Sequence, residues 1–118
     1  IGSVTGRLAV VVDDLISAGT TLLRAVQACR AAGALSVAAF ATHGVFAPGA
    51  ERLLGPDGPD RLYVTDTLLP TRLAPPPGGA AKLVVLPASA LFAEALRRIG
   101  AGESVVALRE MERRVPVR

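Results

Sequence analysis

Five consecutive aliphatic residues, Leu8–Val12 (LAVVV), are typical of a strand buried on both faces of a parallel sheet. A helix is predicted at Thr20–Ala32, where apolar residues recur every three or four positions and Gly33 follows as the stop signal. Similar apolar runs predict three further strands, at Ser36–Ala41, Arg61–Val64 and Lys82–Leu86. Strands that alternate with helices indicate an α/β fold, with a parallel sheet flanked by helices.

The rest of the chain is expected to connect and cover these strands. A short helical turn is predicted at Ala50–Leu54, and the proline-rich segment Pro70–Gly79 is predicted to be an exposed loop. An amphipathic helix is expected at Ser89–Ile99, with Ser89 as its N-cap, and a terminal helix at Val105–Arg114. The length of 118 residues suits one domain, and 51% hydrophobic but only 3% aromatic residues predict an aliphatic core.

Composition excludes several classes of function. The 13 Lys and Arg residues exceed the 10 Asp and Glu residues by three but are spread along the chain, and few aromatic residues are available to stack on bases. We therefore expect no nucleic-acid partner. The single cysteine, Cys29, excludes an internal disulfide and agrees with a reducing cytoplasm, and it falls on the apolar face of the first helix. No apolar run approaches the roughly 20 residues that cross a bilayer, so no membrane association is expected.

The segment between the first strand and the first helix contains the candidate site. Asp13 and Asp14 follow the strand, and ligands of open parallel sheets bind at the carboxyl ends of strands. The small-residue loop Ser17–Thr21 then enters a helix, whose free N–H groups and positive dipole end favour an anion such as phosphate. Carboxylates beside a phosphate loop suit a phosphorylated sugar, because they accept hydrogen bonds from its hydroxyls directly or through Mg²⁺. The alternative is a pair of solvated acids before an ordinary helix.

Four other polar residues are weaker candidates. His43 follows a predicted strand, but without Asp, Glu or Cys at ligand spacing it is more often structural than a metal ligand. Asp66 either lines the site or caps a turn, with no reason in the sequence to prefer one. Arg97 and Arg98 are expected to be solvated charges that favour the carboxyl end of their helix.

The segment VVVDDLISAGTT resembles the phosphoribosyl-diphosphate (PRPP) binding fingerprint of type I phosphoribosyltransferase folds. Further segments follow in the order ATHGVF (Ala41–Phe46), VTDT (Val64–Thr67), LFAEALRRI (Leu91–Ile99) and GESV (Gly102–Val105). This ordered set is similar to the C-terminal domain of the ribose-phosphate diphosphokinase (PRPP synthetase) family. The resemblance implies that residues 1–118 form part of a phosphoribosyltransferase-like C-terminal domain, lacking its upstream half and the N-terminal domain.

The same resemblance implies a reaction. Members of this family transfer diphosphate from ATP to ribose 5-phosphate, which gives PRPP and AMP for nucleotide biosynthesis, with Mg²⁺ and as cytoplasmic homo-oligomers. Carried over by position, Asp13 and Asp14 would hold the ribose hydroxyls, with or without the metal. The loop residues that would wrap the 5-phosphate are Ser17, Ala18, Gly19, Thr20 and Thr21. Ala18 and Thr20 stand where the family more often has Thr and Gly, so one hydroxyl has moved within the loop.

Two alternatives accompany this assignment. The chain is also compatible with a phosphoribosyltransferase that consumes PRPP, or with a non-catalytic regulatory paralogue that retains the fold and binds phosphate. The family's ATP site, metal-binding His and catalytic Lys/Arg loop lie upstream of the matched segments. We therefore expect the chain alone to be inactive and assign no catalytic residue within it.

Overall fold

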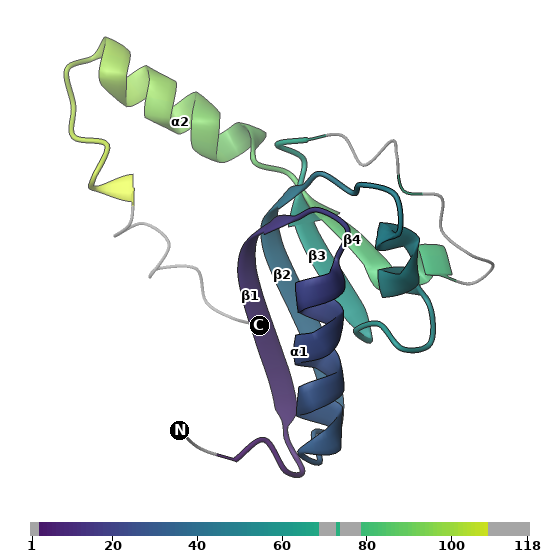
Figure 1. Ribbon diagram of the computed structural model, residues 1–118. Coiled ribbons are helices and arrows are strands. Elements are labelled where there is room, and N and C mark those ends of the chain that lie inside the picture. Colours follow the sequence, from purple (N-terminus) through teal and green to yellow (C-terminus); the bar gives the residue numbers. More distant parts are fainter. Residues whose placement is uncertain (1–2, 69–72, 74–78, 109–118) are drawn as a thin grey trace. The chain divides into compact units, whose positions relative to one another are not determined.

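The computed structural model describes residues 3–68, 73 and 79–108, and the chain divides into two compact units, Ile1–Leu86 and Pro87–Arg118. In these described ranges the first unit contains four strands, one α-helix and two 3₁₀ helices, and the second contains one α-helix (Figure 1). In chain order the elements are β1 (Leu8–Ile16), α1 (Thr20–Ala31), β2 (Ser36–Gly44), η1 (Ala50–Leu54), β3 (Arg61–Thr65), η2 (Gly79–Lys82), β4 (Leu83–Leu86) and α2 (Ser89–Gly100).

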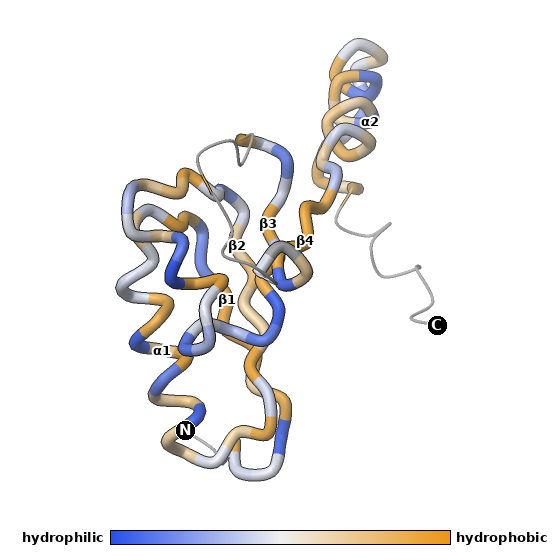
Figure 2. The backbone as a smooth tube through the Cα atoms, turned by 90° about the vertical axis from the view of Figure 1, so that its right-hand side faces the viewer, coloured by the Kyte–Doolittle hydropathy of each residue, from blue (hydrophilic) through white to orange (hydrophobic). Residues whose placement is uncertain are grey.

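The four strands form one parallel sheet in the order β1-β2-β3-β4, which confirms the predicted α/β fold. Helix α1 lies against one face of this sheet, and Figure 2 shows the sheet and the helix side by side. Val26 of α1 packs on Ala9 of β1 and Val37 of β2, and Cys29 packs against the same cluster, as predicted. Gly33, with a φ of 83°, follows the C-cap of α1 and confirms the predicted stop.

The main core lies between the sheet, the start of α1 and η1. Its fully buried members include Phe46, Leu53 and Leu62, which are each at most 1% exposed. The prediction that β1 is buried on both faces is wrong. On the face away from α1, Leu8, Val10 and Val12 are exposed, Val12 at 76%. The reason is that α1 packs on the alternate residues of β1, so only one face of the strand meets the core.

Several predicted boundaries differ from the structure. β1 continues to Ile16 and β2 to Gly44, because the two strands remain paired as far as Ile16 and Gly44. Ser89 is not an N-cap: Ala88 occupies that position, and no side chain in the described part of the chain caps α2. The terminal helix predicted at Val105–Arg114 does not begin at Val105, because residues 105–107 form a bend and a turn; Leu108 is helical, and residues 109–114 lie outside the described residues. Most of the predicted loop at 70–79 also lies outside them.

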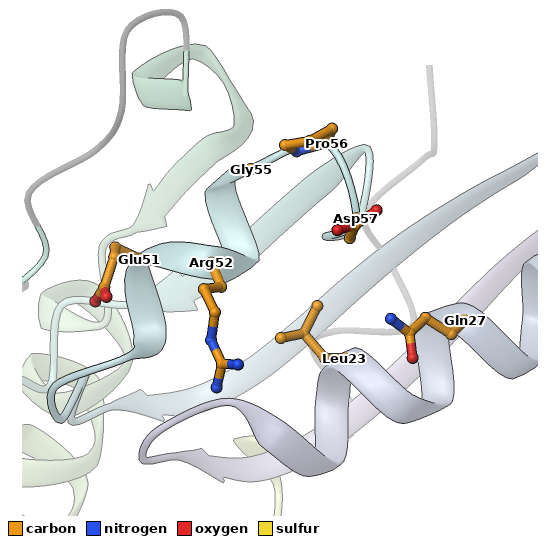
Figure 3. A pocket seen from close by; sticks show the side chains of 7 residues that line it. All are labelled: Leu23, Gln27, Glu51, Arg52, Gly55, Pro56 and Asp57. Carbon is orange, nitrogen blue, oxygen red and sulfur yellow. The ribbon is translucent and has the colours of Figure 1, made fainter.

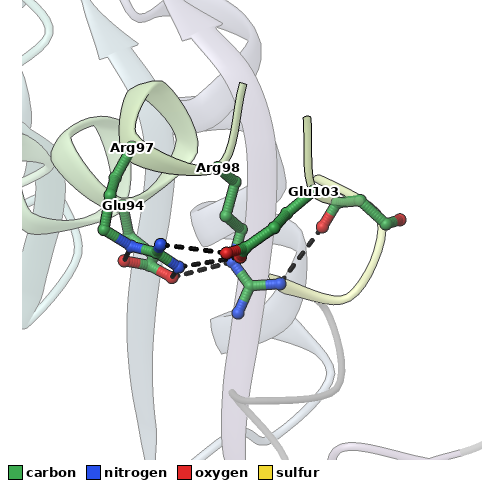
Figure 4. Close-up of polar contacts among 5 residues, drawn as sticks. Glu94, Arg97, Arg98 and Glu103 are labelled. Carbon is green, nitrogen blue, oxygen red and sulfur yellow. Dashed lines mark hydrogen bonds and ion pairs between the residues drawn. The ribbon is translucent and has the colours of Figure 1, made fainter. Parts of the chain in front are cut away.

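The sequence suggested that Arg97 and Arg98 are solvated charges, but both side chains form ion pairs. Arg97 Nε lies 2.9 Å from Glu94 Oε2 and its Nη2 lies 2.9 Å from Glu103 Oε2, while Arg98 Nε lies 2.7 Å from Glu94 Oε1 (Figure 4). Gly102, with a φ of 69°, turns the chain after α2 so that Glu103 returns to the helix. The GESV segment therefore closes the carboxyl end of α2 through an ion-pair network.

This network makes the ionisation of Glu94 a testable property. Hydrogen bonds from Arg97 and then Arg98 lower the pKa of Glu94 to about 2, and hydrogen bonding to Arg97 lowers the pKa of Glu103. Because both pKa values fall on folding, the stabilising contribution is complete above about pH 4.5 and is lost as the pH falls toward 2. In an NMR titration of the carboxyl carbons, we expect Arg97→Gln to raise both pKa values and Arg98→Gln to raise mainly that of Glu94. Unchanged titrations in both variants would contradict the network.

Candidate functional site

Asp13 and Asp14 lie within β1, near its carboxyl end. Asp13 is half-buried and Asp14 is exposed, and the Asp14 N–H donates to Asp13 Oδ1 at 2.9 Å. Successive side chains of a strand point to opposite faces, so the two carboxylates diverge from the backbone. The prediction that both acids follow the strand is wrong, because β1 stays paired with β2 as far as Ile16 and the loop begins only after that residue.

The loop after β1 surrounds a hollow of about 240 Å³, lined by the seven consecutive residues Ile16–Leu22. Gly19 is the N-cap of α1 and has a φ of 76°, a left-handed conformation that favours glycine. No side chain in the described part of the chain caps α1, and its first turn has no acidic residue. The N–H groups at this helix end therefore keep their attraction for an anion, and the hydroxyls of Ser17, Thr20 and Thr21 are exposed beside them.

The segment after β2 supports the entrance to this loop. The N–H groups of Val45 and Phe46 both donate to the carbonyl oxygen of Ile16, at 3.0 and 3.1 Å, and the Ala47 N–H donates to that of Ser17 at 3.2 Å. Leu53 of η1 supports the other end: a Cβ added at Gly19 would lie 2.5 Å from Leu53 Cδ1. Sequence patterns do not indicate this support, since it joins segments far apart in the chain, through backbone bonds at Ile16 and Ser17 and through the Leu53 side chain at Gly19.

His43 and Asp66 lie near the same edge of the sheet. His43 belongs to β2, not to a loop after it, and its Nδ1 forms a 2.8 Å hydrogen bond with Thr67 Oγ1. Asp66 follows β3, and its N–H donates to the Leu86 carbonyl at 3.0 Å, which ties the end of β3 to β4. The bond to Thr67 supports the structural interpretation of His43, and both alternatives for the Asp66 side chain stay predictions.

Within the described ranges, no three His, Cys, Asp or Glu side chains form a group that could hold a metal ion. Asp13 and Asp14 provide carboxylate oxygens, which are suitable ligands for Mg²⁺. Mg²⁺ commonly takes one or two carboxylates and completes its shell with water and substrate oxygens. The acids at the end of β1 therefore fit a metal that arrives with a substrate, and not a metal held by the protein alone.

A larger hollow, of about 410 Å³, lies between α1 and the segment from η1 to Asp57 (Figure 3). Its rim has both signs of charge, from Glu51, Arg52 and Asp57. Glu51 accepts a hydrogen bond from the Gly49 N–H, and Arg52 donates to the Gly49 carbonyl, so both side chains have partners on their own turn. We favour the smaller hollow as the candidate site because its loop presents N–H groups and hydroxyls together.

Among the described residues, no helix has both the length and the apolar character needed to cross a bilayer. This finding concerns the helices alone.

Known proteins with similar sequences and structures belong to one class of enzyme. The chain is 43% identical over 108 residues to a ribose-phosphate pyrophosphokinase from Pasteurella multocida and 41% identical to one from Haemophilus influenzae; each match covers 92% of this chain and 33% of the relative. A crystal structure of phosphoribosylpyrophosphate synthetase from Mycobacterium smegmatis matches 86% of this chain with a TM-score of 0.74 and 32% identity, and this match covers 33% of that protein. The chain thus spans about a third of the length of these relatives.

A family model gives the assignment. The phosphoribosyl synthetase-associated domain matches residues 1–109, which is nearly the whole chain. This match includes the two acids of β1, the loop that follows them and the segment that supports the loop. The chain therefore belongs to the phosphoribosyl synthetase-associated domain family.

Proposed function

We propose that this chain is the ribose 5-phosphate and PRPP binding part of a ribose-phosphate diphosphokinase, corresponding to its C-terminal domain over residues 1–118. The observation that supports this most is the hollow of Ile16–Leu22 at an uncapped helix N-terminus, and Asp13 and Asp14 belong to the strand that leads into it. The names of the relatives favour a synthetase over an enzyme that consumes PRPP.

In the proposed complex, the loop holds the phosphate. The N–H groups at the start of α1 and the hydroxyls of Ser17, Thr20 and Thr21 donate to its oxygens. Gly19 and Ala18 have no side chain large enough to obstruct the approach of the phosphate to the backbone. The absence of an acid from the first turn of α1 leaves this end of the loop without a competing negative charge.

The carboxylates of Asp13 and Asp14 hold the sugar. They accept hydrogen bonds from the ribose hydroxyls while the phosphate is fixed in the loop, and this two-point attachment orients the ring. Mg²⁺, when bound, would neutralise charge between carboxylate and phosphate oxygens. Asp13 and Asp14 are the residues that would contact it.

In the whole enzyme, the oriented sugar takes part in diphosphate transfer. The anomeric oxygen of ribose 5-phosphate forms a bond to the β-phosphorus of ATP, the bond from that phosphorus to the oxygen of AMP breaks, and the hydroxyl proton passes to solvent. This chain supplies positioning, so we expect it to bind ribose 5-phosphate without releasing AMP from ATP. The assembly of the whole enzyme as a homo-oligomer in the cytoplasm is part of the same proposal.

Replacing both acids tests the proposed site. We expect Asp13→Asn with Asp14→Asn to weaken ribose 5-phosphate binding at least about tenfold, or about 1.4 kcal/mol, because amides accept hydrogen bonds less strongly than carboxylates. Isothermal titration calorimetry of the 118-residue chain measures this change. Asp57→Asn, an exposed acid on the rim of the other hollow, is the control and should bind like the wild type. Equal affinity in all three proteins would overturn the assignment.

A further inference from the structure

Phe46 has an unusual backbone conformation. Its φ is 50°, and within the described residues it is the one non-glycine residue with a positive φ. Bulky side chains rarely adopt this left-handed conformation, because Cβ crowds the following carbonyl oxygen. Such a conformation persists only where the surrounding structure enforces it, and it is commonest near functional sites.

Burial of the Phe46 side chain holds the backbone in this conformation. The ring is 1% exposed and belongs to the main core. It lies against Gly44, where an added Cβ would be 2.5 Å from the ring atom Cε2. Relaxation of the backbone to a negative φ would require the ring to leave the core, so burial of the ring maintains the conformation.

The backbone around Phe46 in turn fixes the phosphate loop. The N–H groups of Val45, Phe46 and Ala47 bind the carbonyl oxygens of Ile16 and Ser17. In a trans peptide the C=O and the following N–H point in opposite directions. The N–H groups of Ser17 and Ala18 are therefore turned away from the supporting segment, Val45–Ala47. That segment does not line the hollow of Ile16–Leu22.

We propose that Phe46 is a positioning residue for phosphate, which acts by holding the entrance of the loop so that the amides of Ser17 and Ala18 are available to the ligand. This proposal rests on the proposed function, since it concerns the same phosphate. Phe46 does not line the hollow of Ile16–Leu22, so its role is to position the loop.

The test compares three variants of the 118-residue chain by NMR titration with ribose 5-phosphate and with inorganic phosphate, following the amides of residues 17–21. Phe46→Ala removes the ring and is expected to weaken both ligands at least tenfold in the folded protein. Phe46→Leu retains an apolar side chain and is expected to recover most of the affinity. Leu62→Ala, at a position of the same core that is 0% exposed, is the control for lost stability and should bind like the wild type.

The measured affinities decide separately on the positioning role of Phe46 and on the proposed function. Wild-type affinity in Phe46→Ala, or an equal loss in Leu62→Ala, would overturn the positioning role and leave the proposed function intact. A wild-type chain that binds neither ligand would overturn the proposed function, and the positioning role with it. If Phe46→Ala does not fold, Gly44→Ala decides instead, because its Cβ displaces the ring without removing it, and it should weaken binding if the proposal holds.

Discussion

Replacing Gly19 by alanine is expected to lower the free energy of unfolding of the chain by about 3 kcal/mol. The left-handed conformation of Gly19 costs an L-residue roughly 1–2 kcal/mol. The new Cβ would also lie 2.5 Å from Cδ1 and 2.8 Å from Cγ of Leu53, which is fully buried, and overpacking of this kind costs roughly 1–3 kcal/mol. Urea unfolding measures the change, and titration with ribose 5-phosphate should show weaker binding because the N-terminus of α1 is displaced.

Gly6→Ala is the matched control for this prediction. Gly6 has a similar φ of 68°, but a Cβ at this position would have no atom within 4 Å, so only the backbone strain applies. We expect a loss of about 1 kcal/mol and unchanged phosphate binding. Adding Leu53→Ala to Gly19→Ala should relieve part of the overpacking. The losses in the free energy of unfolding should therefore not be additive. Equal losses in Gly19→Ala and Gly6→Ala would show that Leu53 does not restrict the loop.

Gly58→Ala is expected to be at least as damaging, at about 3–4 kcal/mol. A Cβ at Gly58 would overlap the backbone carbonyl oxygen of Leu53, and backbone cannot move aside as a side chain can. The Gly58 carbonyl also accepts a 2.8 Å hydrogen bond from Arg30 of α1. Displacing this turn would therefore disturb Leu53 and also the hydrogen bond between the turn and Arg30 of α1. We expect a lower midpoint concentration of denaturant in an unfolding experiment.

Gly55→Ala, in the same turn, separates this overlap from a general effect of added volume. Its Cβ would approach the carbonyl oxygen of Arg52 at 3.2 Å, a distance that small adjustments accommodate. We expect a loss of about 1 kcal/mol, typical of a mild substitution. Similar losses at positions 55 and 58 would contradict the argument from the Leu53 backbone.

The local elements were predictable because their signals lie close together in the sequence. The aliphatic run at Leu8–Val12 located the start of β1, the stop signal at Gly33 located the end of α1 to within a residue, and the loop before α1 lies between them as predicted. The ends of β1 and β2 were less predictable. Strand length there is set by pairing, such as Leu15 with His43, and not by the hydrophobicity of either segment.

The supports of the site were not predictable. The bonds from the segment at Phe46 to Ile16 and Ser17 use backbone atoms, so no side-chain pattern marks them. The ion pair between Arg97 and Glu103 depends on the turn at Gly102, which returns Glu103 to α2, whereas the pairs of Arg97 and Arg98 with Glu94 are local to the helix. The backbone bonds to the loop and the return of Glu103 come from the course of the chain in space, whereas the pairs with Glu94 follow from helical spacing.

The sequential order of the strands also has a consequence for folding during synthesis. From β2 on, each of these four strands pairs with the one just before it in the chain, so β2 can pair with β1 while β3 and β4 are still inside the ribosome. The hydrogen bonds between the loop and its supporting segment all lie within residues 16–47. The loop before α1 therefore needs neither β3 nor β4 for these backbone bonds, and a nascent chain ending soon after η1 would be the earliest in which Leu53 reaches Gly19.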